Sequence, residues 1–236
     1  MPKSDPNLIL KEIPEDAIFI IGAGHFGNRA ARILSQESDA PLFVVDVDTN
    51  TLSQMKGLPA KTIVYDGILF LVENYPALNP LNTIVPAVPL HLAFEWLRCH
   101  LGMKFVIKKI SVPEEIKHLL PYTWLGSEES LLVSYADFVC PDDCPEPEFC
   151  TVTGERRELP LHDLLSHLDL LDFRVHVIRS HQLAPGLGGY KVGDLKTAAE
   201  KLIRDEAGKW LLGTACKCHG ILTALEIRSV LEHDNT

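Results

Sequence analysis

The chain of 236 residues lacks any long hydrophobic run and is short of positive charge. No uninterrupted apolar stretch approaches the roughly 18 residues that a membrane helix needs. Residues 1–16 alternate acidic, basic and proline residues and lack the apolar centre of a signal peptide. Lysine and arginine total 22 against 32 acidic residues, and this net charge of −10 disfavours nucleic acid or an anionic membrane as the main partner. We therefore expect a cytoplasmic protein that binds no nucleic acid and inserts into no membrane.

Internal repeats and low-complexity tracts are also missing, and 46% of the residues are hydrophobic, which is enough for a sizeable core. Apolar strand-length segments alternate with helical patterns, as they do in parallel sheets covered on both faces. We predict an α/β protein with a doubly wound parallel-sheet Rossmann fold over residues 1–139. A shift to proline, acid and cysteine at 140–148 predicts that 140–236 form a Cys-rich α/β C-terminal extension or a small second lobe.

The expected elements follow from these patterns. In the first part we expect strands at 17–21, 42–45, 62–65, 83–88, 105–110 and 131–134, helices after the first strand and at 68–75 and 91–101, and a short helix capped by Ser111. In the second part we expect helices at 162–168, 194–204 and 219–231 and strands at 173–178 and 209–213.

Three glycines at G-x-G-x-x-G spacing follow the first apolar run. Gly22 permits a tight turn, Gly24 lets the backbone approach a pyrophosphate, and Gly27 lets the next helix lie against the strand. The helix that follows offers backbone N–H groups to phosphate oxygens. The residues predicted to contact the cofactor in this loop are Gly22, Ala23, Gly24, His25, Phe26 and Gly27.

An acidic residue ends the second apolar run, 24 residues after Gly22. At this spacing, Asp46 is expected to meet a ribose 2′-hydroxyl, with Val47 beside it. The carboxylate would repel a 2′-phosphate, so NAD is favoured over NADP. Asp66, after the third strand, either approaches the adenosine or caps a turn.

Five cysteines and a histidine fall in two groups in the second half. Their spacing is C-x3-C-x5-C and C-x-C-H, formed by Cys140, Cys144, Cys150, Cys216, Cys218 and His219. Cys140 and Cys216 each come after an expected strand, and loops at the carboxyl ends of strands line the ligand crevice of open α/β sheets. Thiolate and imidazole donors suit zinc or an iron–sulfur cluster. The spacing matches no standard motif for either.

Two other interpretations of these cysteines stay open. One is thiol redox chemistry, because a thiol at the start of the helix expected at 219–231 would have a lowered pKa and make Cys216 or Cys218 nucleophilic. The other is that the cysteines are small buried apolar residues. Glu146 and Glu148 are expected to belong to a solvated acidic loop.

A basic residue and a histidine precede a glycine-rich segment at 184–190. Arg179 and His181 would bind an anion or act as acid and base on a substrate, in a loop between strand and helix. A mobile turn with a solvated arginine is the alternative.

Residues 17 to about 90 resemble the NAD-binding domains of bacterial potassium-uptake regulators, the TrkA-N type. The resemblance is carried by the segment from Ile20 to Gly27, by Val44 to Asp48, and by Tyr65 and Asp66. It implies that Gly22, Gly24, Gly27 and Asp46 contact the nucleotide, with the adenosine ribose on Asp46. It does not extend to the cysteine-rich second half.

Two hypotheses of function follow. In the first, the chain is a cytoplasmic NAD-dependent oxidoreductase whose cysteine–histidine residues supply a metal or thiol redox site near the nicotinamide. In the second, it is a non-enzymatic NAD/NADH-sensing regulatory protein whose cysteines form a structural metal site. The sequence leaves open the substrate, the protein partner and whether the chain forms a homo-oligomer.

Overall fold

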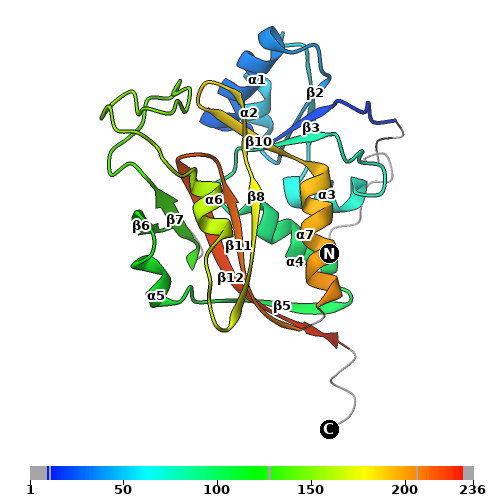
Figure 1. The fold of residues 1–236 in the computed structure, drawn as a ribbon. Coiled ribbons are helices and arrows are strands. Elements are labelled where there is room, and N and C mark those ends of the chain that lie inside the picture. Colours follow the sequence, from blue (N-terminus) through cyan, green and yellow to red (C-terminus); the bar gives the residue numbers. More distant parts are fainter. Residues whose placement is uncertain (1–9, 11, 127–128, 206, 231–236) are drawn as a thin grey trace. The chain divides into compact units, whose positions relative to one another are not determined.

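The computed structural model describes residues 10, 12–126, 129–205 and 207–230 and is of the α/β class (Figure 1). The chain divides into two compact units. The first unit comprises Met1–Val88 and Gly189–Lys196, and the second comprises Pro89–Gly188 and Thr197–Thr236. The boundary expected at 139/140 does not coincide with this division. Within the described residues, no helix is both long and apolar enough to cross a membrane.

The first unit is built on four parallel strands in the order β3-β2-β1-β4. These strands are β1 (Ile18–Ile21), β2 (Leu42–Asp46), β3 (Ala60–Val64) and β4 (Thr83–Pro86). The central strand β1 is buried along its whole length because helices cover both faces of the sheet. The fifth strand, β10 (Leu187–Lys191), adds antiparallel to β4 through Tyr190 opposite Ile84, so this sheet is mixed.

The connections between the parallel strands are helical; the sequence predicted the first and the third of them but not the short second one. They are α1 (His25–Glu37), α2 (Thr49–Ser53) and α3 (Gly67–Asn74). Phe70 of α3 packs against Phe19 of β1 with ring centroids 5.7 Å apart, whereas α1 and α2 lie on the other side of the sheet (Figure 1). The β-α-β part of the expected fold is therefore confirmed.

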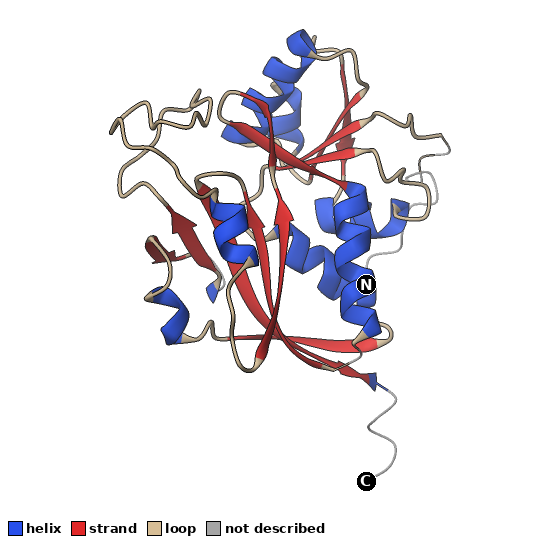
Figure 2. Ribbon diagram, viewed as in Figure 1, coloured by secondary structure: helices blue, strands red, loops and turns tan. Residues whose placement is uncertain are grey.

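The second unit contains a mostly antiparallel sheet in the order β6-β7-β12-β11-β8, with β5 also paired to β12 (Figure 2). Only β8 and β11 run parallel, with Arg179 opposite Ala215. The strands are β5 (Phe105–Ile110), β6 (Tyr122–Leu125), β7 (Leu131–Ser134), β8 (Phe173–Arg179), β11 (Gly208–Ala215) and β12 (His219–Ser229).

The helices of the second unit are short, apart from α4 and the continuation of α7. They are α4 (Leu92–Leu101), α5 (Glu114–Lys117), α6 (Leu161–Ser166) and α7 (Val192–Arg204), which starts in the first unit. Ile116 of α5 and Leu165 of α6 share one buried cluster with Leu211 and Leu222 of the sheet. This buried cluster packs the two short helices against one face of the second sheet.

Four expectations about elements were wrong. The segments 105–110 and 131–134 form strands, but these pair antiparallel with β12 in the second sheet rather than extending a doubly wound one. Residues 219–231 were expected to be helical, and 219–229 are strand β12, because both edges of that strand find pairing partners. The N-cap residue of α5 is Pro113 and not Ser111. Residues 184–190 are not an open loop, since β9 (His181–Ala184) and β10 form a hairpin.

Candidate functional sites

The glycine loop, residues Gly22–Gly27, connects β1 to α1 in the first unit. Gly22 has φ +102°, which L residues rarely adopt, and a Cβ there would lie 2.5 Å from the carbonyl oxygen of Ala87. A Cβ on Gly27 would collide with the carbonyl oxygen of Gly22. Gly24 faces open space, because a Cβ there would meet nothing within 4 Å. The first and third glycines are therefore required by the fold, and the second leaves room for a ligand.

The carboxylate of Asp46 holds this loop in place. Its two oxygens accept hydrogen bonds from the backbone N–H groups of Ala23 at 2.6 Å and Asp48 at 2.8 Å. Each oxygen keeps a second lone pair with which to accept a hydroxyl group. Among the other expected contacts, Phe26 and Val47 are exposed side chains. Asp66 caps α3 by accepting from the N–H groups of Ile68 and Leu69, so the turn-capping role is the one observed.

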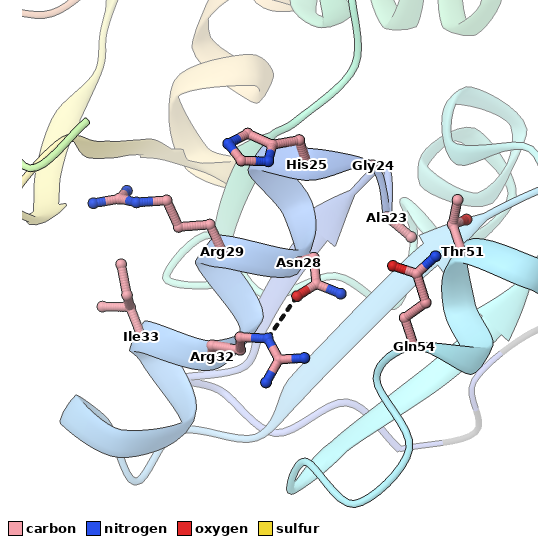
Figure 3. Close-up of a pocket in the computed structure, with 9 residues that line it drawn as sticks. All are labelled: Ala23, Gly24, His25, Asn28, Arg29, Arg32, Ile33, Thr51 and Gln54. Carbon is pink, nitrogen blue, oxygen red and sulfur yellow. Dashed lines mark hydrogen bonds between the residues drawn. The ribbon is translucent and has the colours of Figure 1, made fainter. Parts of the chain in front are cut away.

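A pocket of about 690 Å³ lies beside the glycine loop (Figure 3). Figure 3 shows that Thr51 and Gln54 lie across it from the side chains of α1, where Arg32 donates a hydrogen bond to Asn28 over 2.7 Å. The lining residues are Ala23, Gly24, His25, Asn28, Arg29, Arg32, Ile33, Thr51 and Gln54. The pocket therefore combines the start of a helix with two guanidinium groups.

These arginines were missing from the sequence prediction. The signal for them was present, because residues 25, 28, 29 and 32 follow the i, i+3, i+4, i+7 spacing of one helix face. That face begins at the second glycine of the motif. Positive side chains on it add attraction for phosphate to that of the backbone N–H groups.

The second unit brings the cysteine–histidine residues together at one end of its sheet. The turn between β11 and β12 carries Cys216 and Cys218, His219 is the first residue of β12, and the segment after β7 carries Cys140. The Sγ atom of Cys140 lies 3.5 Å from Nε2 of His219, and the Sγ atom of Cys216 lies 3.9 Å from Nδ1 of the same ring. Of the ligands expected from sequence, Cys140, Cys216 and His219 are thus in direct contact.

Two of the remaining cysteines affect the pKa of Cys140, and Cys218 has a shifted pKa of its own. Burial raises the pKa of Cys140, and the neighbouring thiol groups of Cys144 and Cys150 raise it further. Burial, followed by the charge of Glu146, raises the pKa of Cys218 to about 11. We call Cys140, Cys144, Cys150, Cys216, Cys218 and His219 the cysteine group.

The helix N-terminus that was expected to make Cys216 or Cys218 nucleophilic is not there. Both belong to a β-hairpin turn, so no helix N-terminus lowers their pKa values. Burial and the nearby carboxylate of Glu146 instead raise the pKa of Cys216 to about 12. The low pKa belongs to Cys150, where hydrogen bonds from the backbone of Thr153 and Val152 lower it to about 7.

Glu146 was expected to be solvated, and the structure places it beside two members of the cysteine group, Cys216 and His219. A carboxylate oxygen of Glu146, the Sγ atom of Cys216 and a ring nitrogen of His219 lie within 4.8 Å of one another. Its Oε2 atom also accepts a hydrogen bond from the backbone N–H of Lys217 over 3.4 Å. Sequence reasoning missed this residue because the contact joins positions 71 residues apart. Glu148 is exposed and pairs with Arg156 at the surface.

Arg179 and His181 lie at the end of β8 and the start of β9, and both are exposed. The register of β8 and β11 puts Arg179 opposite Ala215, next to Cys216 in sequence. Among the described residues, no hydrogen bond or ion pair joins the side chains of Arg179 or His181 to the cysteine group. The structure therefore pairs the strand of Arg179 with the strand that precedes Cys216, without joining the side chain of Arg179 or His181 to the cysteine group.

The fold and these two sites define an α/β protein of two units. Its first unit has a glycine loop on parallel β-α-β units, and its second has a cysteine–histidine group on a mostly antiparallel sheet.

Residues 93–228 match a family model described as "Uncharacterized protein, C-terminal domain". A protein of Archaeoglobus fulgidus, described as "Uncharacterized protein", is 34% identical over 224 residues, which cover 88% of this chain and 98% of that relative. The chain belongs to this family. The matched range contains the whole cysteine group and not the glycine loop.

Proposed function

We propose that the chain is an NAD(H)-binding protein whose first unit is a Rossmann-type dinucleotide domain similar to the TrkA-N type. In this proposal it acts as a cytoplasmic oxidoreductase, and the cysteine group provides its metal or thiol centre. The observation that carries the proposal is the glycine loop, in which Gly22 and Gly27 are sterically obligatory while Gly24 borders open space.

The start of α1 has the features of a phosphate site. Its N-cap residue is Gly24, and in the part of the chain that the structure describes, no side chain caps this helix end. The backbone N–H groups of a first helical turn have no partner within the helix and carry a partial positive charge. Arg29 and Arg32 line the same pocket, whose volume of about 690 Å³ is in the range of small-molecule sites.

Asp46 supports a nucleotide with a free ribose 2′-hydroxyl. The carboxylate ends β2 beside Ala23, and both of its oxygens retain acceptor capacity after their backbone hydrogen bonds. A 2′-phosphate would bring like charges together at this point. We therefore expect NADH to bind more tightly than NADPH, even with Arg29 and Arg32 nearby.

An oxidoreductase role assigns substrate handling to Arg179 and His181. Both side chains are exposed; Arg179 ends β8 opposite Ala215, the residue before Cys216, and His181 follows two residues later at the start of β9. The raised pKa values of Cys216 and Cys218 disfavour thiol attack at those two positions, because the thiol rather than the thiolate is present at neutral pH.

A second candidate function is a non-enzymatic NAD/NADH sensor. It is favoured by one observation. Among the described residues, the side chain of His181 has no hydrogen-bond partner that would orient it as a general base. In this case nucleotide binding would change a conformation that a protein partner recognises, and the cysteine group would hold a structural metal.

The test of nucleotide binding is calorimetry on the full chain with NAD, NADH and NADPH. Gly24→Ala is the informative variant, because a methyl group there contacts no protein atom within 4 Å but occupies the ligand's space. We expect at least a tenfold weaker affinity for NADH with an unchanged thermal transition. If wild-type protein gives no heat with any of the three nucleotides, or if Gly24→Ala binds as tightly as wild type, the proposal is wrong.

The two roles separate in a turnover assay. An oxidoreductase must oxidise NADH when an acceptor is supplied, and that rate must fall in His181→Ala. A sensor binds NADH without consuming it, and His181→Ala leaves its affinity unchanged.

A further inference from the structure

We propose that Glu146, Cys216 and the Nδ1 atom of His219 bind one divalent transition-metal ion of the zinc type, with a fourth coordination position left open. This site refines the metal part of the proposed function and is independent of nucleotide binding. It differs from the set expected from sequence, in which the ligands were cysteines and His219 alone.

The first argument is the distance between donors. A zinc ion with bonds of about 2.3 Å to sulfur and about 2.0 Å to nitrogen holds those two atoms about 3.5 Å apart in tetrahedral geometry. The Sγ atom of Cys216 and Nδ1 of His219 are 3.9 Å apart, a few tenths of an ångström longer. With the carboxylate of Glu146, all three donors lie within 4.8 Å of one another. Among the described residues, Glu146, Cys216 and His219 form the one group of three potential metal donors whose ligand atoms all lie within 4.8 Å of one another.

The second argument is the environment of the Cys216 sulfur. The backbone N–H groups of Cys218 and His219 donate to it over 3.5 Å and 3.3 Å. Two amide dipoles directed at one sulfur stabilise a thiolate, which is the form that binds metal. Both hydrogen bonds to the sulfur come from backbone N–H groups next to the turn between β11 and β12, so no side chain is needed to stabilise the thiolate.

The third argument is the other side of the imidazole ring. A histidine that binds metal through one nitrogen usually donates a hydrogen bond from the other to an acceptor that fixes the ring. The Sγ atom of Cys140 lies 3.5 Å from Nε2 of His219 and fits that role. Cys140 is therefore a positioning residue that orients the ligand without contacting the ion.

The fourth argument is how Glu146 is held. It lies between Pro145 and Pro147 and has φ +47°, a backbone conformation that few non-glycine residues adopt. Its Oε2 atom accepts from the backbone N–H of Lys217, and its carbonyl oxygen accepts from Nζ of the same lysine, each over 3.4 Å. These bonds attach the 140–150 segment to the turn that lies between Cys216 and His219.

The chemistry of the donor set selects the metal class. One thiolate, one imidazole and one carboxylate form a mixed set of intermediate softness, which zinc accepts in tetrahedral geometry. Three protein ligands leave a fourth position for water or a substrate oxygen, as in catalytic rather than structural zinc sites. The exposure of His219 leaves this position accessible from solvent.

The experiment measures metal binding by the full chain after chelator treatment. We expect one zinc per chain by elemental analysis, and cobalt(II) should give the absorption of a tetrahedral site with a single thiolate. Glu146→Gln and His219→Gln should each weaken zinc binding at least tenfold, and Cys216→Ser should also remove the thiolate-to-cobalt band. Cys140→Ala should weaken zinc binding by about 10- to 100-fold and keep that band.

Matched controls come from the same segment and the same residue types. Glu148→Gln removes a surface carboxylate two residues away, and Cys99→Ser removes a cysteine in α4, so both should bind zinc as wild type does. Circular dichroism of each apo variant separates loss of a ligand from loss of the fold. NADH affinity should stay at the wild-type value in Glu146→Gln, which separates failure of this site from failure of nucleotide binding.

Three results would overturn the proposal. One is wild-type zinc affinity in Glu146→Gln. Another is a loss in Cys144→Ser and Cys150→Ser as large as in Cys216→Ser, which would show a site made of several thiolates. The third is protein purified anaerobically with iron and inorganic sulfide, which would show an iron–sulfur cluster.

Discussion

The five cysteines of the cysteine group have different chemistry because their surroundings differ within a few ångströms. Burial raises the pKa values of Cys216 and Cys218 to about 12 and about 11. Backbone N–H groups at Thr153 and Val152 lower the pKa of Cys150 to about 7. The residue type is the same in all three cases, and the hydrogen bonds and the desolvation decide which thiol is ionised.

This difference predicts which cysteine is alkylated first. In chelator-treated protein we expect iodoacetamide to modify Cys150 with a rate that reaches half its maximum near pH 7, because the thiolate is the reacting form. Cys216 and Cys218 should remain unmodified below about pH 9. Peptide mapping by mass spectrometry at several pH values measures this. Thr153→Val removes one hydrogen bond to the sulfur and should move the Cys150 profile to higher pH.

Gly27 gives a second prediction at the residue scale. Alanine favours a helix over glycine by up to about 1 kcal/mol, so Gly27→Ala would stabilise an isolated α1. In the folded unit its Cβ meets the carbonyl oxygen of Gly22, a backbone atom that cannot rotate away. We expect the clash to dominate and to reduce the free energy of unfolding by about 1–3 kcal/mol, measured by urea titration.

The control for this variant is Gly24→Ala, which has open space around the added methyl group. It should change the free energy of unfolding by less than about 0.5 kcal/mol. Equal stabilities of the two variants would contradict the steric account of the motif.

At the scale of single elements, β12 shows where periodicity is insufficient. Its apolar residues Ile221, Leu222, Ala224, Leu225 and Ile227 recur at spacings that fit a helix face, which is why a helix was expected. In the structure, β11 pairs along one edge of the strand and β7 and β5 pair along the other. A strand covered on both faces needs apolar residues on both, so it loses the alternation that marks half-buried strands.

The residue before α4 links that helix to β11 and β12. His91 is buried, with Nδ1 2.8 Å from the hydroxyl of Thr223 and Nε2 3.0 Å from that of Thr214. Burial, with a smaller effect of Lys109, lowers its pKa to about 3. The imidazole is therefore neutral in the folded protein at all but strongly acidic pH.

This histidine predicts a loss of stability in acid. Below about pH 6.5 the unfolded chain binds a proton at His91 that the folded chain does not, so the free energy of unfolding falls as the pH falls towards 3. The slope from one such group approaches about 1.4 kcal/mol per pH unit. His176, whose pKa burial and Lys201 lower to about 4, adds to the loss.

Urea unfolding at pH 7, 6, 5 and 4 measures this slope. His91→Gln should lower the stability at pH 7 and flatten the dependence on pH. His118→Gln, at the exposed end of α5, should leave the slope unchanged. A wild-type slope in His91→Gln would show that another group is responsible.

For the whole molecule, the main feature is that the chain leaves the first unit after Val88 and returns to it at Gly189–Lys196. The returning segment supplies β10, which pairs with β4 through Tyr190 and Lys191. The marked change in composition at 140–148 lies inside the second unit, where it forms part of the cysteine group. The change in composition therefore marks a segment that contributes Cys140 and Cys144 to the cysteine group.

The two units predict separate responses to the two ligands. Hydrogen exchange followed by mass spectrometry should show that NADH slows exchange at the glycine loop and β2. Zinc should slow it at 140–150 and at the β11–β12 turn. A ligand at 100 times its dissociation constant stabilises the state that it binds by about 2.7 kcal/mol, which is a measurable slowing. Protection of the same peptides by both ligands would contradict the assignment of one site to each unit.

The sequence by itself determined the local features of this protein: the β1–α1 glycine turn, the strand ending in Asp46, the helices α1 and α3 and the set of cysteines. Each depends on steric limits or on periodicity within a few residues. Tertiary structure decided the second sheet, the hairpin at 181–191, the strand β12 and the position of Glu146 against Cys216 and His219. These depend on pairing between segments far apart in the chain, because a strand's partner and a donor's neighbour leave no trace in the residues immediately around them.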